Sequence, residues 1–105
     1  MITHIVLLQV APNIKEDQII KALKKLERLQ STTITQIKSF TYGKHSSFEG
    51  LNRGYNYGFT MQFSSFPDRD YYLQHQDHID IAKNHILPLL ENGIESALAF
   101  DYESF

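Results

Sequence analysis

The segment YYLQHQDHID, residues 71–80, concentrates side chains that can carry chemistry. It holds two tyrosines, two aspartates and two of the five histidines of the chain. Histidine is the side chain whose ordinary pKa lies nearest to neutral pH, so it exchanges protons under physiological conditions. Three interpretations are open for this segment: an acid–base site, a metal site, or the polar surface of a helix.

A helix break inside this segment would separate the roles of its two histidines. Asp77 fits a helix N-cap, because Asp80 follows three residues later and an apolar periodic run comes next. His78 would then lie in the first turn of a new helix, where an imidazolium is disfavoured and the neutral imidazole can accept a proton. The sequence therefore makes His78 the candidate general base. The alternative is a partly buried histidine that binds a backbone carbonyl and has no catalytic role.

A metal site is the weaker interpretation of the same residues. His75 and His78 supply two ligands at a common spacing, whereas a metal site needs three or four convergent ligands. The chain has no cysteine, which excludes disulfides, thiolate nucleophiles and zinc–thiolate sites. We predict no metal and no cofactor.

The remaining sequence predicts the elements that position these residues. Alternating or continuous apolar residues predict strands at 2–10, 33–43, 55–66 and 94–105, the last with Phe100 buried. Helical periodicity predicts one amphipathic helix after an N-cap at Asn13, and a broken helical region from an N-cap at Ser65 to Pro88. A polar loop covers 44–54. The order β-α-β-β-α(α)-β predicts one ferredoxin-like α+β domain over residues 1–105, with a four-stranded antiparallel sheet and its helices on one face.

The uncovered face of such a sheet predicts a partner. The first strand is apolar in both phases, and Tyr55, Tyr57, Phe59, Met61 and Phe63 form one stripe of the third. A large exposed apolar face is rare in a soluble monomer. We therefore predict a homodimer through sheet-to-sheet packing, which closes a dimeric α/β barrel.

Charge and hydropathy limit the other partners. The formal net charge is −2, and the clustered lysines alternate with acidic residues at helical spacing, so we predict no nucleic-acid partner. No apolar run approaches the roughly 18 residues that span a membrane, and the N-terminal strand lacks a basic flank typical of a signal peptide. We predict no membrane partner and a cytoplasmic location.

The chain resembles the stress-responsive A/B-barrel domain family (Dabb) along nearly its whole length. The resemblance rests on THIVLLQV near the start, GYNYGFTMQFSSFPDRDYYLQHQDH in the middle and HILPLLENGIESALAFDYE at the end. The family motif is a tyrosine, two residues, then His-Pro-x-His. Here it corresponds to Tyr72, His75 and His78, with Gln76 in the place of the proline.

The resemblance implies roles by motif position. In this motif the chain is similar to plant olivetolic acid cyclase, which closes a linear polyketide by an aldol condensation without a cofactor. The resemblance implies His78 as the general base and Tyr72 as a catalytic partner that helps to hold the substrate. It also implies His4 and Tyr57 as substrate-binding residues, although Tyr57 stands where the family has a histidine.

The interpretations without chemistry stay open for these residues: packing for Tyr72, a structural hydrogen bond for His4, and a core or interface position for Tyr57. The predicted function is binding of a small apolar carbonyl or aromatic compound in a pocket between sheet and helices, with cyclase or lyase chemistry. The alternatives are a non-enzymatic stress-response protein whose dimeric barrel has no catalytic role, and a cofactor-free monooxygenase.

Overall fold

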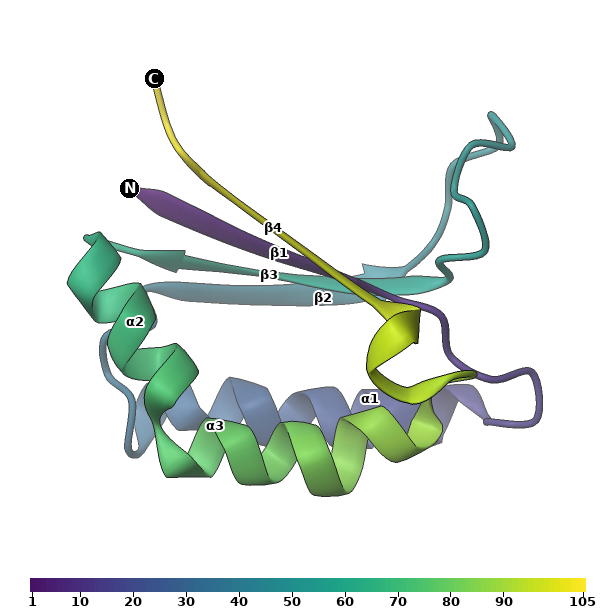
Figure 1. Cartoon of the computed structure of the whole chain (residues 1–105), viewed down its shortest axis with the longest axis horizontal. Helices are drawn as coiled ribbons and strands as arrows, with labels where there is room; N and C mark the ends of the chain where they lie inside the picture. The colour runs from purple at the N-terminus through teal and green to yellow at the C-terminus, as the bar shows by residue number, and fades with distance from the viewer.

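One antiparallel sheet forms the frame of the molecule. The computed structural model describes all 105 residues. Its strands are β1 (Ile2–Leu8), β2 (Ser39–Lys44), β3 (Tyr57–Phe63) and β4 (Ala97–Glu103), in the spatial order β2-β3-β1-β4. All helices lie on one side of this sheet (Figure 1). This arrangement confirms the predicted ferredoxin-like α+β fold.

The alternation of side chains along the central strand β1 sorts residues between the two faces. In a strand, successive side chains point to opposite sides of the sheet. Ile2 and Leu8 are 1% exposed and belong to the core, and His4 lies between them on the same face. In the register of the sheet His4 is opposite Met61 of β3 and Asp101 of β4. The fold therefore turns His4 towards the helices.

The other face of the sheet carries large apolar side chains without cover. Leu7 of β1 lies opposite Leu98 of β4, and the next pair of the same face is Ile5 and Phe100. Phe100 is 59% exposed, and Tyr102 is exposed on the same strand. The prediction that Phe100 is buried is thus wrong for the single chain, because its phase in β4 places it on the open face.

The first helical region begins later than predicted. α1 (Glu16–Glu27) has Lys15, and not Asn13, at its N-cap, and the Gln18 side chain accepts a 2.8 Å hydrogen bond from the Lys15 N–H. Residues 11–14 form a turn instead, in which the Ile14 N–H donates to the Ala11 carbonyl. The helix buries one apolar stripe against the sheet, and a short 3₁₀ turn (Arg28–Ser31) follows it. The stripe consists of Ile19, Ala22, Leu23 and Leu26.

The predicted strand at 33–43 is only half a strand. Ile34 and Ile37 are buried, but they lie in a turn in which the Ile37 N–H donates to the Ile34 carbonyl. Their spacing of three residues therefore belongs to a turn that holds the chain in the core. β2 begins only at Ser39.

The second helical region is broken where a break was predicted. α2 (Phe66–Gln74) has the predicted N-cap Ser65, whose hydroxyl accepts a hydrogen bond from the Asp68 N–H. α3 (Gln76–Ile81) follows after His75, and the run continues as a π turn (Ala82–Ile86) and a 3₁₀ turn (Leu87–Leu89). A last 3₁₀ turn (Gly93–Ser96) leads into β4. None of these helices has the length and apolar character needed to cross a bilayer.

The N-cap of α3 is a different residue from the one predicted. The Nδ1 atom of His75 accepts a 3.0 Å hydrogen bond from the Asp77 N–H, so His75 and not Asp77 caps the new helix. The backbone of His75 is extended, which turns the axis of α3 away from that of α2. Tyr72 in α2 and His78 in α3 can therefore face each other, which one straight helix would not allow.

Candidate functional site

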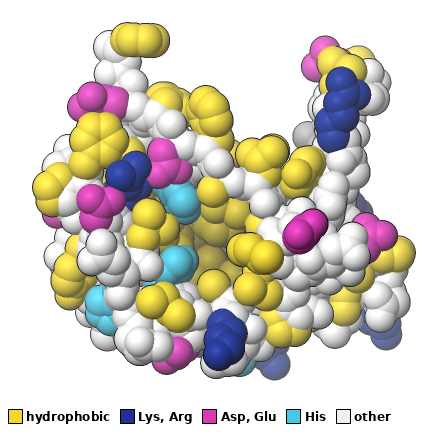
Figure 2. Space-filling view, viewed as in Figure 1, with side chains coloured by type: hydrophobic (Ala, Val, Ile, Leu, Met, Phe, Trp, Pro, Cys, Tyr) yellow, Lys and Arg dark blue, Asp and Glu magenta, His cyan; other side chains and the backbone are white.

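A cavity of about 230 Å³ lies between the sheet and the second helical region. Figure 2 shows a hollow on this side of the molecule, with hydrophobic side chains as its floor and histidines on its wall. Twelve of its fourteen lining residues are hydrophobic, and the two others are His4 and His78. Tyr72 also lines it. Three of the four predicted site residues thus share one apolar cavity, which is the usual setting of a small-molecule site.

His78 has one ring nitrogen bound and the other unbound. Its Nδ1 atom lies 3.2 Å from the Leu73 carbonyl oxygen. Because a carbonyl oxygen only accepts, Nδ1 carries the proton in this contact, and in the neutral ring Nε2 then has the free lone pair. Burial lowers the pKa of His78 below its ordinary value, and the neighbouring His4 and His75 lower it further, while the Leu73 hydrogen bond acts in the opposite direction. The ring is therefore a neutral proton acceptor near pH 7.

The cause of the lowered pKa of His78 differs from the one expected from the sequence. The first-turn position was predicted to disfavour the imidazolium through the helix dipole. The largest effect in the structure is desolvation of the ring in the cavity wall. The expected direction is the same, but its source is tertiary packing.

Tyr72 joins the two histidines. Its ring centroid lies 4.2 Å from that of His78 and 6.0 Å from that of His4, and its side chain is fully buried. Its hydroxyl has no hydrogen-bond partner within the protein. Burial raises the pKa of Tyr72 far above its ordinary value, so the hydroxyl stays protonated and can act only as a neutral donor or acceptor. A buried polar group without a partner is uncommon and calls for a ligand or a water.

His4 is tied to the edge strand by a short hydrogen bond. Its Nδ1 atom lies 2.6 Å from Oδ1 of Asp101, and the residue is 5% exposed. The other carboxylate oxygen of Asp101 accepts a 3.0 Å hydrogen bond from Nη1 of Arg69 in α2. A histidine, a carboxylate and a guanidinium therefore form a chain that starts at the cavity wall and ends at the surface.

Tyr57 does not reach this cavity, contrary to the expectation that it shares a pocket with His4, Tyr72 and His78. It lies two residues before Phe59, at the start of β3, and lines a crevice over α1 with Ile20 and Leu23. The cavity instead lies over the second helical region. A role of Tyr57 as a ligand-binding residue of the cavity thus lacks the required geometry.

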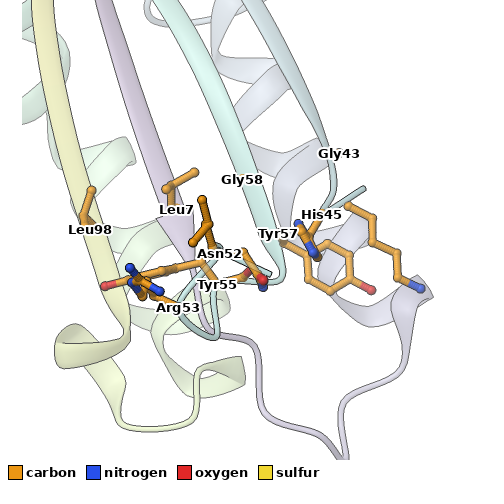
Figure 3. A pocket seen from close by; sticks show the side chains of 11 residues that line it. Leu7, Gly43, His45, Asn52, Arg53, Tyr55, Tyr57, Gly58 and Leu98 are labelled. Atoms are coloured by element: carbon orange, nitrogen blue, oxygen red, sulfur yellow. The ribbon is translucent and has the colours of Figure 1, made fainter. Parts of the chain in front are cut away.

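A second, larger pocket of about 470 Å³ lies where the β2–β3 loop meets the sheet. Figure 3 shows its lining residues, which include Leu7 and Leu98 of the sheet, Arg53 and Tyr55 of the loop, and Tyr57 at the start of β3. This larger pocket is separate from the cavity that His4, Tyr72 and His78 line. No three histidine, aspartate or glutamate side chains anywhere in the chain converge as metal ligands.

The family model described as "Stress responsive A/B Barrel Domain" matches residues 2–104. The chain belongs to this family. No curated protein sequence matches the chain.

Solved structures of other proteins share the fold along their whole length. A dimeric ferredoxin-like protein of unknown function from Jannaschia sp. CCS1 is 25% identical, covers 98% of each chain and has a TM-score of 0.86. A protein from Arabidopsis thaliana is 26% identical over 100% of this chain and 96% of its own, with a TM-score of 0.87. A hydroxynitrile lyase from Passiflora edulis is 19% identical over 99% and 95%, with a TM-score of 0.81, which shows the fold alone.

Within this member of the A/B barrel family, the structure adds residues that the sequence analysis did not select. Asp101 and Arg69 extend the site from His4, and His75 caps the helix that carries His78. Asp101 is 97 positions from His4, so only the pairing of β1 with β4 reveals the contact. The capping role of His75 could have been recognised from the sequence, because it lies next to the predicted helix break and the residue before a helix is its N-cap.

Proposed function

We propose that the cavity binds a small apolar carbonyl compound, and that the protein is a cofactor-independent lyase or cyclase with His78 as general base. The observation that carries the proposal is the buried Tyr72 hydroxyl, which has no partner in the protein and lies beside a neutral histidine. A carbonyl oxygen of a ligand would accept the hydrogen bond that this hydroxyl lacks.

In the cyclase form of the reaction, Nε2 of His78 takes a proton from the carbon next to a carbonyl group. The electron pair of the broken C–H bond forms an enolate, whose oxygen accepts the Tyr72 hydrogen bond. The enolate carbon then bonds to a second carbonyl carbon of the same molecule, and the imidazolium returns its proton to the new alkoxide. This is the aldol type of ring closure that the motif resemblance implies.

In the lyase form, Nε2 of His78 takes the proton of a hydroxyl group on the substrate. The carbonyl group forms, the neighbouring carbon–carbon bond breaks, and the leaving carbon takes the electron pair and then the proton of the imidazolium. A hydroxynitrile lyase has this fold, so the fold is compatible with this class of reaction. Both forms use the same two residues.

The size of the cavity restricts the ligand. About 230 Å³ is below the range of roughly 300–1,000 Å³ that is typical for drug-sized ligands. Its walls are mainly apolar, with aliphatic side chains such as Val6, Ile86 and Leu87 and the aromatic ring of Phe59. A small aromatic or short-chain compound with one carbonyl or hydroxyl head fits this lining better than a charged metabolite.

We also propose that two chains pack sheet against sheet. The open face carries Leu7, Leu98, Phe100 and Tyr102 without cover, and relatives of the same fold are described as dimeric. The loop at 45–56 extends on this side of the sheet, away from the helices (Figure 1). Its Phe48 is fully exposed, as expected for a side chain that contacts a second copy.

The functional proposal is tested with a panel of small aromatic aldehydes, ketones and hydroxynitriles. Binding is followed by ligand-observed NMR, and turnover by ultraviolet absorbance, for the native protein and for His78→Gln and Tyr72→Phe. The matched control is His85→Gln, because His85 is exposed on the outer side of the same helical run. We expect native turnover in the control, no turnover in His78→Gln, and a kcat lower by a factor of about 100 in Tyr72→Phe.

Each outcome separates the candidate functions. Equal turnover by His78→Gln and the native protein would remove His78 as the base. Binding without turnover by the native protein would leave a ligand-binding protein. If no compound binds, the non-enzymatic dimer becomes the better account.

A further inference from the structure

We propose that Arg69 is a positioning residue, which clamps the Asp101 carboxylate so that His4 presents Nε2 as a second acceptor to the ligand. The inference rests on the proposed function, since it concerns the same cavity. It adds a residue on the outer surface of α2 that neither the motif nor the cavity lining contains.

The clamp is built from contacts on several sides of the guanidinium. Arg69 donates from Nη1 to Asp101, and from Nε and Nη2 to Oδ1 of Asp70, at 3.0, 3.1 and 2.9 Å. Its Cζ atom lies 5.1 Å from the ring centroid of Phe66. The side chain is 22% exposed, so it is held at the surface by defined partners. A planar guanidinium fixed in this way can hold a carboxylate in one orientation.

Asp101 needs such a clamp because of its position. It lies on β4, which is the edge strand of the sheet, and its side chain is 21% exposed. Without Arg69 the carboxylate could rotate towards water and release His4. With Arg69 on one oxygen, the other oxygen stays 2.6 Å from Nδ1 of His4.

The contact with Asp101 selects one form of the His4 ring. Because a carboxylate accepts, the proton of the neutral ring lies on Nδ1, and the lone pair lies on Nε2. The charged and titratable groups around His4 are Asp101 and Arg69 on one side, and Tyr72 and His78 across the cavity.

The consequence for the ligand is a defined set of partners. Tyr72, His78 and His4 line the cavity: the Tyr72 hydroxyl can donate a hydrogen bond, and the Nε2 atoms of the two histidines can accept one when the rings are neutral. A ligand that carries a hydroxyl group in addition to its carbonyl oxygen and its acidic proton would use all three. We therefore assign the substrate class as small hydroxylated carbonyl compounds, such as a hydroxy ketone or hydroxy aldehyde.

The test is an NMR measurement of the His4 ring that needs no ligand. In the native protein at pH 7 we expect ¹⁵N shifts of a neutral ring protonated on Nδ1, and a far-downfield Nδ1–H proton signal. Arg69→Gln should lose that proton signal and show a mixture of ring forms, and Asp101→Asn should do the same. Arg69→Lys should retain part of the signal. Arg28→Gln is the control, because Arg28 is exposed and forms no ion pair.

Two results would overturn the inference. The first is a native His4 whose Nε2 carries a proton at pH 7, either alone or together with Nδ1, which would need no variant to detect. The second is an Arg69→Gln protein that is folded by circular dichroism and keeps the native His4 signals. Neither result depends on turnover, so this inference can fail while the role of His78 stands, and the reverse also holds. For the substrate class, equal affinity of the native protein for benzaldehyde and its hydroxylated analogues would contradict the third contact.

Discussion

Removal of the Tyr72 hydroxyl should stabilise the protein and impair its function. In the folded chain this hydroxyl is fully buried and has no hydrogen-bond partner, whereas in the unfolded chain it binds water. Leaving a buried polar group unsatisfied costs about 1–3 kcal/mol. Tyr72→Phe keeps the ring and its contacts with His78 and Phe63, so it removes only this cost. We expect the free energy of unfolding to rise by about 1 kcal/mol, the lower end of that range, since a water in the cavity would offset part of the cost.

The assay is urea unfolding followed by circular dichroism, with protein concentration held fixed because dimerisation contributes to stability. A gain of about 1 kcal/mol corresponds to a rise in Tm of about 4 °C for a domain of this size. Tyr71→Phe is the matched control: Tyr71 is the preceding residue of α2, is exposed, and should change stability by less than about 0.5 kcal/mol. In turnover, loss of a donor to the developing oxyanion should cost a factor of about 100 in kcat.

A loss of stability in Tyr72→Phe would refute this reasoning. It would mean that the hydroxyl is well bonded in the free protein, so that a ligand has no unmet partner to satisfy. A gain in stability with unchanged turnover would separate the two steps, because the hydroxyl would then be unsatisfied but unused. Only a gain in stability together with lost turnover fits the proposed role, and it is the trade-off expected where a site is held ready for a ligand.

The remaining predictions concern protonation, capping and assembly. Because burial lowers the pKa of His78, the acid limb of kcat/KM should lie below pH 6.5, and His78→Gln should remove turnover. In the unfolded chain His78 takes up its proton near pH 6.5, whereas in the folded chain it does so only at lower pH, so the unfolded state binds more protons between the two values. The free energy of unfolding should therefore fall as the pH decreases below 6.5. Urea unfolding across a pH series should show a smaller fall for His78→Gln. His75→Ala removes the N-cap of α3 and should cost about 1 kcal/mol in the same unfolding assay, whereas an unchanged value would contradict the cap. Phe100→Asp should give a monomer by light scattering if the open face is the interface, and a stable dimer of this variant would place the interface elsewhere.

The fold was predictable because its signals are local. The apolar alternation of β3, the Ser65 cap and the order of elements need only neighbouring residues to be recognised. The errors arose where a local pattern had two solutions. Ile34 and Ile37 were assigned to a strand but lie in a buried turn, so tertiary packing overrode their local pattern. The start of α1 was placed at an Asn13 cap, whereas the helix is capped at Lys15, whose N–H donates to the Gln18 side chain.

The candidate site was only partly predictable for the same reason. Tyr72 and His78 lie six residues apart, and a predicted break was enough to bring them together. The partner of His4 is 97 residues away on another strand, and that of Asp101 is on a helix between them. No spacing in the sequence encodes such contacts. For Tyr57 the motif position predicted a place in the cavity of His4, Tyr72 and His78. Tyr57 does lie on β3, but its side chain packs over α1 and does not line that cavity.

The strand β4 links the cavity to the open face through the alternation of its side chains. Its residues on the helix side include Ala97 and Ala99, which are small and line the cavity, whereas Leu98, Phe100 and Tyr102 are large and lie on the open face. If β4 had large residues facing the helices, their side chains would fill the cavity. If it had small residues on the open face, that face would offer little apolar surface for a second chain to bury. An edge strand with small residues towards its own core is therefore poorly suited to a monomer without a ligand. It suits a chain that keeps space for a small molecule on one side and covers its other side with a second copy.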